Sequence, residues 1–401
     1  MKILVINCGS SSVKYKLFSH KNNGLELIAS GVVEKIGEEI SYFDYESVKG
    51  KVSYKKPIND HREAFNEILE AICHEEYGVL KRLDEVEIVG HRVVHGGEEI
   101  TRPVIIDNNV IEIIKKYSTM APLHNPANLT GIIVLRQLIP TALHIAVFDT
   151  AFHQTISDYA YIYAIPYEYY EKYKIRRYGF HGTSHAYVSR KAAELLNKSI
   201  EELKIITCHL GAGSSIAAIK NGLCVETSMG LTPLEGLVMG TRSGDIDPSI
   251  FYFLSKWENK SVDEIYNILN EKSGLFGLSG ISKDLRLIKE KADEGNYRAN
   301  LAIKVFAHRV KKYIGAYTAI MNGVDVIVFT AGIGEKAYWL REMVLEGLDY
   351  LGLRLDKTKN LDPEKYGGEI STEDSKVKVF VIPTDEERVI AEESLSTVFK
   401  K

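Results

Sequence analysis

Apolar residues at the start of the chain form two short strand-like runs joined by a polar turn. Ile3–Ile6 is continuous, apolar and β-branched, and it ends at the small polar segment 7–12. In the next run, Val13–Phe18, apolar residues alternate with lysines at first, which is roughly the period of a strand with one solvated face. The pattern predicts a β-hairpin with a turn rich in Gly and Ser.

The same pattern returns about two hundred residues later. Ile205–Leu210 is a strand-like run, the small residues 211–215 form a turn, and Ile216–Ile219 resumes the apolar pattern. A repeat at this distance suggests two related domains. We expect the division between them at Asp149–Thr150.

Helical patterns fill the regions between the strands. Apolar residues at helical spacing occur in two sets: Phe65, Ile68, Leu69 and Ile72, and Ala302, Phe306, Val310, Tyr313, Tyr317 and Ile320. The buried-strand pattern 324–329 follows the second set and runs into a third glycine-rich turn, 331–334. Strands that alternate with helices predict α/β layers. The alternating tyrosines over 159–163 predict a half-buried strand rather than an aromatic ligand platform.

Composition narrows the class of protein. The chain has 401 residues and a net charge of −4, which favours two globular domains and disfavours a nucleic-acid partner. No apolar run approaches the length of a membrane span or of a signal peptide. The four cysteines are scattered, without a C-x-x-C motif. We therefore expect a cytoplasmic protein with no membrane association.

Three glycine-rich turns, 7–12, 211–215 and 331–334, follow strands and could bind phosphate through backbone N–H groups. None is a Walker motif, and the first is not the Rossmann fingerprint. Lys14 lies just beyond the first turn, where it could reach a phosphate or be a solvated strand lysine.

Four further residues are candidates for chemistry. Arg92 and Arg242 lie in glycine-containing segments, where a guanidinium suits a carboxylate or phosphoryl group; a structural salt bridge is the equal alternative. His181 lies between glycines, which suggests a loop, although most histidines only pack. Asp149 ends an apolar strand, where it could face a ligand or cap the turn.

Together these motifs resemble those of the acetate kinase family. The resemblance rests on ordered blocks across nearly the whole chain: 7–14, 91–97, 121–126, 148–153, 179–185 and 227–248. It implies an α/β duplicated actin-like (ribonuclease H-like) two-domain fold with an interdomain ATP cleft. One domain would span 1–149 plus a returning C-terminal helix, 386–401, and the other 150–385.

The resemblance also implies the reaction and its participants. Acetate and ATP would give acetyl phosphate and ADP, with Mg²⁺ as the metal and Mn²⁺ as the alternative, in a homodimer. A carboxylate is already a nucleophile near neutral pH, so a general-base role for Asp149 is not needed.

Residue roles follow from the resemblance alone. Catalysis is expected from Arg92, Asp149, His181 and Arg242, with Arg92 and Arg242 holding the acid and the phosphoryl group, His181 stabilising the transition state, and Asp149 positioning the carboxylate or serving the metal network. The acyl pocket would be walled by Val94, Leu123, Phe180 and Pro233. The nucleotide would contact Ser10, Ser12, Lys14, His209, Leu210, Gly211, Ala212, Gly213, Asp284, Leu285, Arg286, Gly332, Ile333, Gly334, Glu335 and Lys336. The metal would be bound by Asn7 and Glu386.

Two positions depart from the family's pattern. Ala212 stands where the family usually has Asn, which removes a side-chain contact to phosphate. Asp385, directly before Glu386, also stands where the family usually has Asn. Two alternatives remain: a propionate or other short-chain acyl kinase on the same scaffold, and a non-catalytic nucleotide-binding module.

Overall fold

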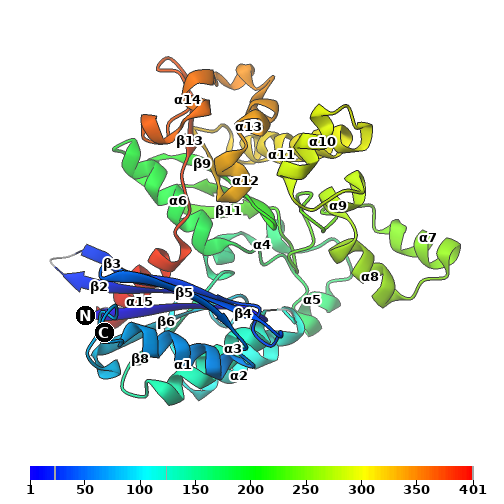
Figure 1. Ribbon diagram of the computed structural model, residues 1–401. Coiled ribbons are helices and arrows are strands. Elements are labelled where there is room, and N and C mark those ends of the chain that lie inside the picture. The colour runs from blue at the N-terminus through cyan, green and yellow to red at the C-terminus, as the bar shows by residue number, and fades with distance from the viewer. Residues whose placement is uncertain (22–23, 123, 400–401) are drawn as a thin grey trace. The chain divides into compact units, whose positions relative to one another are not determined.

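The computed structural model describes residues 1–21, 24–122 and 124–399. The chain divides into two compact units, unit 1 (Met1–Phe152 and Asp385–Lys401) and unit 2 (His153–Thr384). Each unit contains a sheet that is covered by helices (Figure 1). The domain bounds expected from the sequence, 1–149 plus 386–401 and 150–385, stay a prediction.

The sheet of unit 1 has the strand order β5-β4-β3-β2-β1-β6-β8-β7. Its strands are β1 (Lys2–Cys8), β2 (Ser12–Lys21), β3 (Gly24–Glu34), β4 (Ser41–Ser47), β5 (Gly50–Lys56), β6 (Val86–Val93), β7 (Val104–Ile105) and β8 (Leu143–Phe148). β1 is antiparallel to β2 and parallel to β6, and β6 is parallel to β8. The first predicted hairpin is therefore present as β1 and β2.

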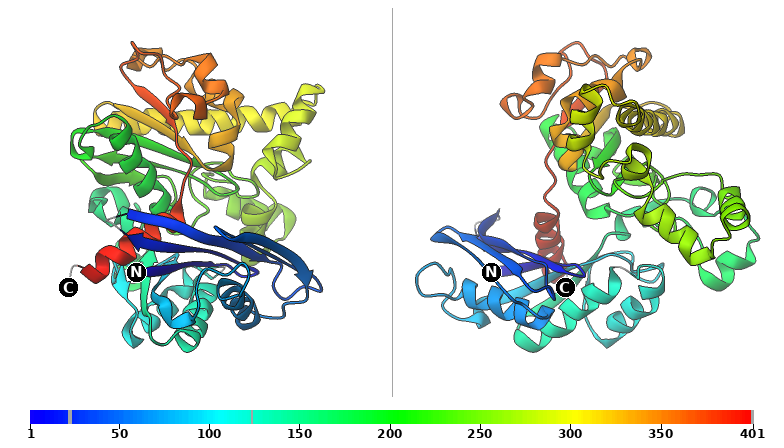
Figure 2. Two further views of the ribbon diagram at one scale, coloured as in Figure 1. Left: turned by 60° about the vertical axis from the view of Figure 1, so that its left-hand side comes forward. Right: turned by 45° about the vertical axis from the view of Figure 1, so that its right-hand side comes forward.

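Helices cover both faces of this sheet, which explains why the centre of β1, Ile3–Ile6, is apolar without interruption. They are α1 (His61–Ile72), α2 (Asn108–Lys116), α3 (Asn125–Leu138) and α15 (Glu386–Phe399). Ile390 of α15 packs with Ile3 and Val5, whereas Phe65 of α1 packs with Leu4 and Ile6 on the other face. Figure 2 shows α15 lying along the strands near the amino terminus.

The sheet of unit 2 repeats the central part of the first one. Its order is β11-β10-β9-β12-β13, with β9 (Lys204–Leu210), β10 (Ser214–Lys220), β11 (Leu223–Thr227), β12 (Val326–Thr330) and β13 (Lys378–Val381). β9 is antiparallel to β10 and parallel to β12, and β12 is parallel to β13. These directions match those of β1, β2, β6 and β8, so the predicted duplication is confirmed.

The helices of unit 2 are α4 (Asp158–Tyr161), α5 (Glu168–Tyr173), α6 (Gly182–Leu195), α7 (Ser249–Glu258), α8 (Val262–Glu271), α9 (Gly274–Ser279), α10 (Leu285–Asp293), α11 (Tyr297–Met321), α12 (Ala331–Lys336), α13 (Tyr338–Leu345) and α14 (Lys357–Leu361). Phe306 and Val310 of α11 belong to the core that also contains Ile206 and Phe329 of the sheet. The predicted apolar face of this helix is correct except at Ile320, which is 52% exposed.

The prediction of a strand over 159–163 is wrong. The segment contains the short helix α4, and Tyr159 is 86% exposed. Aromatic residues favour strands, but this preference is weak and depends on tertiary context.

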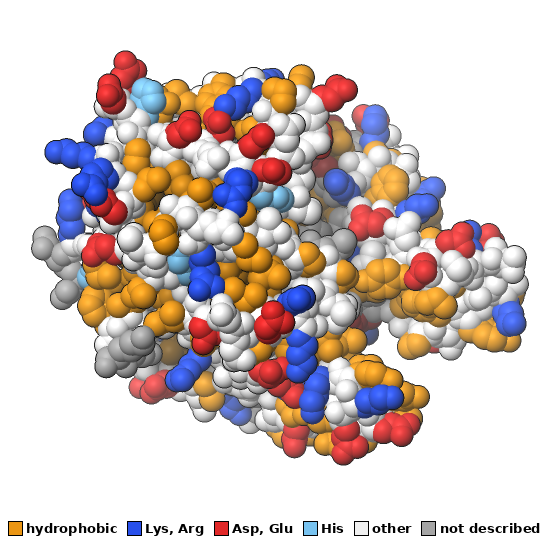
Figure 3. Space-filling view, turned by 90° about the horizontal axis from the view of Figure 1, so that it is seen from below, with side chains coloured by type: hydrophobic (Ala, Val, Ile, Leu, Met, Phe, Trp, Pro, Cys, Tyr) orange, Lys and Arg blue, Asp and Glu red, His pale blue; other side chains and the backbone are white. Residues whose placement is uncertain are grey.

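Charged side chains of both signs are intermixed with apolar ones on the face shown in Figure 3. Among the described residues, no helix is both long enough and apolar enough to cross a membrane.

Candidate active site

Three parallel strands of unit 1 bring predicted site residues together. Asn7 and Arg92 lie near the carboxyl ends of β1 and β6, and Asp149 follows β8 directly. The carboxyl ends of parallel strands share one edge of a sheet, where ligand sites of α/β proteins form. Glu386, the first residue of α15, joins this edge through a 3.7 Å approach of its Oε2 to Nε of Arg92.

Carboxylate and amide oxygens fix the guanidinium of Arg92. Its Nη2 donates to Oδ2 of Asp149 at 2.5 Å, and its Nε donates to Oδ1 at 3.3 Å. This bidentate arrangement is the strong form of an arginine–carboxylate pair. Nη1 donates to Oδ1 of Asn7 at 3.2 Å. The side chain is therefore oriented before any substrate binds.

Burial and neighbouring charges oppose each other at this edge of the sheet. Burial disfavours the charged form of Arg92, but the carboxylates of Asp149 and Glu386 more than offset it and raise the pKa of Arg92. The pKa of the Glu386 carboxyl is raised to about 7, first by burial and then by the charges of Asp149 and Glu387. Arg92 and Lys14 act in the opposite direction. A cation here would favour the ionised carboxylate.

Two asparagines that the sequence analysis missed hold the segment that follows Arg92. Asn128 accepts a hydrogen bond from the N–H of Val94 at 3.1 Å and donates to the carbonyl of Cys8 at 2.7 Å. Asn125 accepts from the N–H of His95 at 3.0 Å. Both are buried in the first half of α3. Buried asparagines three residues apart in an apolar helix are a signal that could have found them.

The residues predicted to line the acyl pocket are divided between the two units. Val94 is buried in unit 1, and Phe180 is buried in unit 2. Pro233 lies in unit 2, and its carbonyl accepts from Arg242. Leu123 lies outside the described residues.

His181 is held in an uncommon backbone conformation. Its φ is 57°, in the left-handed region, directly before α6. Such residues cluster at functional sites. Its Nδ1 lies 2.9 Å from Oγ of Ser215, and its ring stacks on that of His209 with centroids 4.2 Å apart. The predicted loop position is correct, and the ring is fixed from two sides.

Ser215 links His181 to a second, fully buried histidine. Nε2 of His185 lies 2.8 Å from Oγ of Ser215, and Nδ1 lies 2.7 Å from Oγ1 of Thr207. Burial, and then the neighbouring His153 and His209, lower the pKa of His185 well below its ordinary value. His185 is therefore neutral in the folded protein near pH 7.

Arg242 is held more loosely than Arg92. Its Nη1 donates to the carbonyl of Pro233 at 3.4 Å and lies 3.8 Å from Sδ of Met239. Over residues 1–21, 24–122 and 124–399 it forms no ion pair with a carboxylate. Burial lowers its pKa, and Glu271 opposes this only in part.

His181 and Arg242 converge on one glycine. A Cβ added to Gly213 would lie 3.4 Å from Cε1 of His181 and 3.6 Å from Nη1 of Arg242. The second glycine-rich turn therefore lies beside both side chains.

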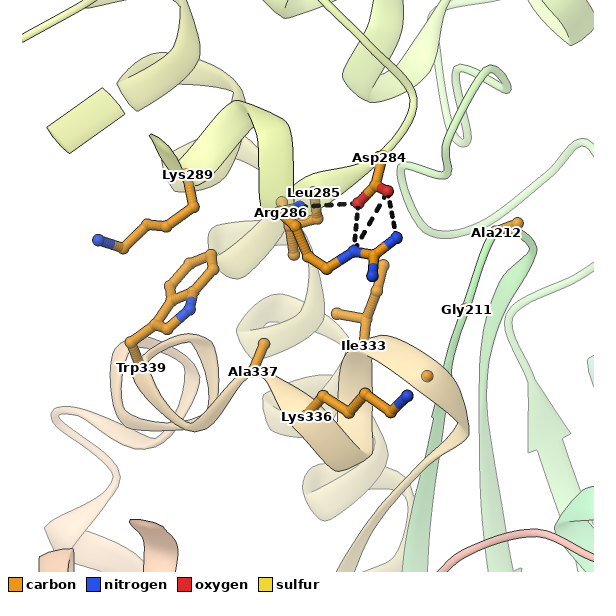
Figure 4. Close-up of a pocket in the computed structure, with 11 residues that line it drawn as sticks. Gly211, Ala212, Asp284, Leu285, Arg286, Lys289, Ile333, Lys336, Ala337 and Trp339 are labelled. Carbon is orange, nitrogen blue, oxygen red and sulfur yellow. Dashed lines mark hydrogen bonds and ion pairs between the residues drawn. The ribbon is translucent and has the colours of Figure 1, made fainter. Parts of the chain in front are cut away.

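Half of the predicted nucleotide residues line a cavity of about 560 Å³ in unit 2. It is lined by Gly211, Ala212, Asp284, Leu285, Arg286, Lys289, Gly332, Ile333, Lys336, Ala337 and Trp339. Figure 4 shows Gly211 and Ala212 at one end and Trp339 and Lys289 at the other, with Ile333 between them. Arg286 pairs with Asp284, their Nη2 and Oδ2 atoms 2.6 Å apart.

Lys289, Ala337 and Trp339 were not predicted. Lys289 is three residues beyond Arg286 on the same helix, so helical spacing could have found it. Its Nζ lies 5.4 Å from the centre of the Trp339 ring.

Other predicted nucleotide residues do not line this cavity. They are His209, Leu210, Gly213, Gly334 and Glu335 of unit 2, and Ser10, Ser12 and Lys14 of unit 1. Leu210 is fully buried in the core, so only its backbone could reach a ligand. Lys14 is exposed on β2.

The oxygen atoms around Arg92 suit a hard divalent cation. Asn7, Asp149 and Glu386 offer amide and carboxylate oxygens, the ligand type that Mg²⁺ prefers. In the described part of the chain, no group of three or more His, Cys, Asp or Glu side chains is arranged to hold a metal. Mg²⁺ commonly uses only one or two carboxylates and takes its other ligands from water and phosphate, so the residues present fit such an ion.

Comparisons with known proteins identify the family of the chain. The sequence model of the acetokinase family matches residues 2–392. The chain belongs to the acetokinase family. It is 57% identical over 398 residues to an acetate kinase of Thermoanaerobacterium thermosaccharolyticum, covering 98% of both chains. A second acetate kinase, from Thermoanaerobacter pseudethanolicus, is 57% identical over 399 residues, again covering 98% of each chain.

Solved structures of the family have the same fold. The crystal structure of Porphyromonas gingivalis acetate kinase matches with a TM-score of 0.92 at 45% identity, covering 99% of both chains. A propionate kinase from Francisella tularensis matches with a TM-score of 0.90 at 42% identity, covering 98% of this chain and 99% of that one. These matches confirm the predicted α/β, duplicated actin-like two-domain fold.

Proposed function

We propose that the protein transfers the γ-phosphoryl group of ATP reversibly to acetate, giving acetyl phosphate and ADP. The observation that carries the proposal is Arg242, a partly buried cation without a carboxylate partner in the described chain, placed with His181 around Gly213. Phosphoryl transfer spreads negative charge over the equatorial oxygens, and positioned cations stabilise it. Membership of the acetokinase family supports acetate as the acceptor.

The proposed roles separate orientation from charge stabilisation. Arg242 and His181 stabilise the phosphoryl group in flight, and Arg92 binds the carboxylate of the acid. Asp149 is engaged by two nitrogens of Arg92, which suits it to orient that arginine. A base is not required, because acetate is ionised at neutral pH.

A divalent ion completes the proposed site. Asn7 and Glu386 would hold Mg²⁺, with Mn²⁺ as the alternative, and the bound ion would neutralise charge on the phosphates. The cavity lined by Ala212, Ile333 and Trp339 would hold the nucleotide. We place the reaction in the cytoplasm and propose a homodimer; light scattering on purified protein tests the oligomeric state.

Propionate is the second candidate acceptor, because a propionate kinase shares this fold at a TM-score of 0.90. One methylene group in an apolar pocket changes binding by only about 1–3 kcal/mol. Val94, Phe180 and Pro233 are proposed to set this preference.

Purified protein incubated with Mg-ATP, hydroxylamine and one acid per reaction tests the proposal. Acyl hydroxamate reports acyl phosphate directly. We expect acetate to give the highest kcat/KM among acetate, propionate and butyrate. A higher value for propionate would keep the mechanism and change the substrate, and no hydroxamate from any acid would refute the proposed function.

A further inference from the structure

A polar cluster of unit 2 surrounds the loop 228–248, which joins β11 to α7 and carries Pro233 and Arg242. None of the roles proposed above uses this cluster. Its members are Tyr163, Arg177, Glu226 and Glu235; we call them the Arg177 cluster.

Arg177 holds the first residues of the loop through their backbone. Its Nη1 donates to three successive carbonyls, of Thr227, Ser228 and Met229, at 2.8, 3.2 and 3.3 Å. Its Nη2 donates to Oε1 of Glu235 at 2.6 Å. A guanidinium can make these bonds at once because its donors lie in one rigid plane. Arg177 therefore connects the start of the loop, up to Met229, to Glu235, six residues further along the chain.

Tyr163 joins the same two parts of the loop. Its hydroxyl donates to Oε2 of Glu235 and accepts from the N–H of Leu231 at 2.9 Å. The fit is close: a Cβ added to Gly230 would lie 1.7 Å from Oε2 of Glu235 and 2.2 Å from the Tyr163 hydroxyl. Gly230 is therefore required for this arrangement.

Asp245 closes the other end of the loop. Its Oδ1 accepts from the N–H of Gly236 at 2.8 Å, and its Oδ2 accepts from the hydroxyl of Tyr313 at 2.7 Å. Nη1 of Arg309 lies 3.5 Å from the same Oδ2 and donates to the carbonyls of Gly236 and Asp245. Both ends of the segment 231–236 are thus tied to polar side chains.

Packing alone does not hold this segment. Leu231, Leu234 and Glu235 line a cavity of about 520 Å³, so the loop has space to move on that side. Pro233 lies midway between the two anchored residues, Leu231 and Glu235, and its carbonyl accepts from Nη1 of Arg242 at 3.4 Å. The position of Arg242 therefore depends on hydrogen bonds made by side chains outside the loop.

We propose that Arg177 and Tyr163 are positioning residues for phosphoryl transfer: through Glu235 and the backbone of 227–231 they fix Pro233, and through Pro233 they fix the guanidinium of Arg242. They touch neither substrate. The expected effect on catalysis rests on the proposed function. The claim that Arg177 and Tyr163 hold the loop 228–248 in place, which we call the hold on the loop, is independent of that function. A misplacement of about 1 Å in such a site can cost on the order of 100-fold in rate.

Tyr163→Phe is the most direct variant, because it removes one hydroxyl and keeps the ring. Hydrogen–deuterium exchange should become faster in peptides from 228–248 and stay unchanged in β12 and α12. The kcat/KM for acetate should fall by about 10- to 100-fold. The Kd for ADP, measured by calorimetry, should stay within about twofold, because other residues line that cavity. Arg177→Met should act in the same direction, and Arg177→Lys should restore part of the activity.

Two exposed residues of unit 2 supply matched controls. Tyr159→Phe removes a hydroxyl from a tyrosine that is 86% exposed, and Arg354→Met removes an exposed ion pair with Asp374; neither should change exchange or activity. Unchanged exchange in both Tyr163→Phe and Arg177→Met would overturn the hold on the loop. Faster exchange with unchanged acetate kinetics would overturn the positioning role, as would equal losses of acetate turnover and ADP binding. An inactive wild-type protein would refute the proposed function but leave the exchange result to decide the hold on the loop.

Discussion

The two arginines of the proposed site are held in opposite ways. Arg92 of unit 1 is paired with Asp149 at 2.5 Å and approached by Glu386, whereas Arg242 of unit 2 contacts the carbonyl of Pro233 and forms no ion pair within the described chain. A desolvated charge without a partner destabilises the folded protein, and a bound anion offsets this cost. The difference suggests that Arg92 has a fixed orientation in which it binds the acid, and that the charge of Arg242 remains available for the phosphoryl group.

Arg92→Ala should produce the largest loss of stability. It leaves the buried Asp149 without its counter-charge and removes one from the partly buried Glu386. Removing one partner of a buried pair costs about 3–5 kcal/mol. Urea unfolding at pH 8 measures this loss. Arg242→Ala is the matched control and should lose much less, because it breaks no ion pair. Equal losses in the two variants would remove the proposed difference between the arginines.

Acid should destabilise both units through buried neutral histidines. In unit 1, burial and the neighbouring His144 hold the pKa of His91 well below its ordinary value; in unit 2, burial does the same for His185. Below a pKa of about 6.5 the unfolded chain binds protons that the folded chain excludes, so stability falls with pH by up to about 1.4 kcal/mol per pH unit for each histidine. Above that pH this contribution is constant.

Single substitutions show how much of this pH dependence of stability comes from the histidine of each unit. His91→Gln and His185→Gln should each reduce the dependence of the unfolding free energy on pH, between pH 6 and 5, by about one proton. An unchanged slope in either variant would show that the histidine it removes is not the group that titrates.

Val94→Ala should lower the KM for propionate relative to that for acetate. The side chain is buried beside the Arg92 strand, and removing its methyl groups makes room for one more methylene, worth roughly 1 kcal/mol or about fivefold in the ratio. Val93→Ala, which alters the core on the other side of the strand, is the control and should leave the ratio unchanged. The same ratio in Val94→Ala and wild type would refute the pocket assignment.

Asp385→Asn should have the smallest effect. Lys16 pairs with Asp385 at 2.7 Å and lies 3.3 Å from Glu387, so the extra acid next to Glu386 is already neutralised. A partly exposed pair of this kind contributes less than about 1 kcal/mol. Activity ratios with Mg²⁺ and Mn²⁺ should match those of the wild type, as should those of Asp374→Asn, a control at an exposed pair. A changed ratio would show that Asp385 acts at the metal.

Much of the fold was predictable because it depends on local patterns. The continuous apolar runs of β1, β9 and β12 mark strands covered on both faces, and the polar residues that follow such strands must lie at one sheet edge. Asp149 was found in this way, whereas Arg92 was found as an arginine in an apolar segment flanked by glycines. The prediction at 159–163 was wrong because the preference of tyrosine for strands was too weak to decide the structure.

The rest of the site depends on contacts between residues far apart in sequence. Asn128 bonds to Cys8 across 120 positions, and Arg177 bonds to Glu235 across 58. No local spacing reports such pairs. Trp339 lines the cavity proposed for the nucleotide only because α13 follows the third glycine turn. Sequence reasoning finds residues whose type suits the chemistry; the residues that hold them in place require the structure.

The rate of acetyl hydroxamate formation by Arg242→Ala, measured together with its Kd for ADP and its melting temperature, tests the central claim most directly. We predict that kcat falls on the order of 10³-fold, as for arginines that stabilise a phosphoryl group in flight, while ADP affinity and melting temperature stay close to those of the wild type. A kcat within about tenfold of the wild type, or a loss of rate that follows a loss of folding, would contradict the claim that Arg242 is the free cation on which the transfer depends.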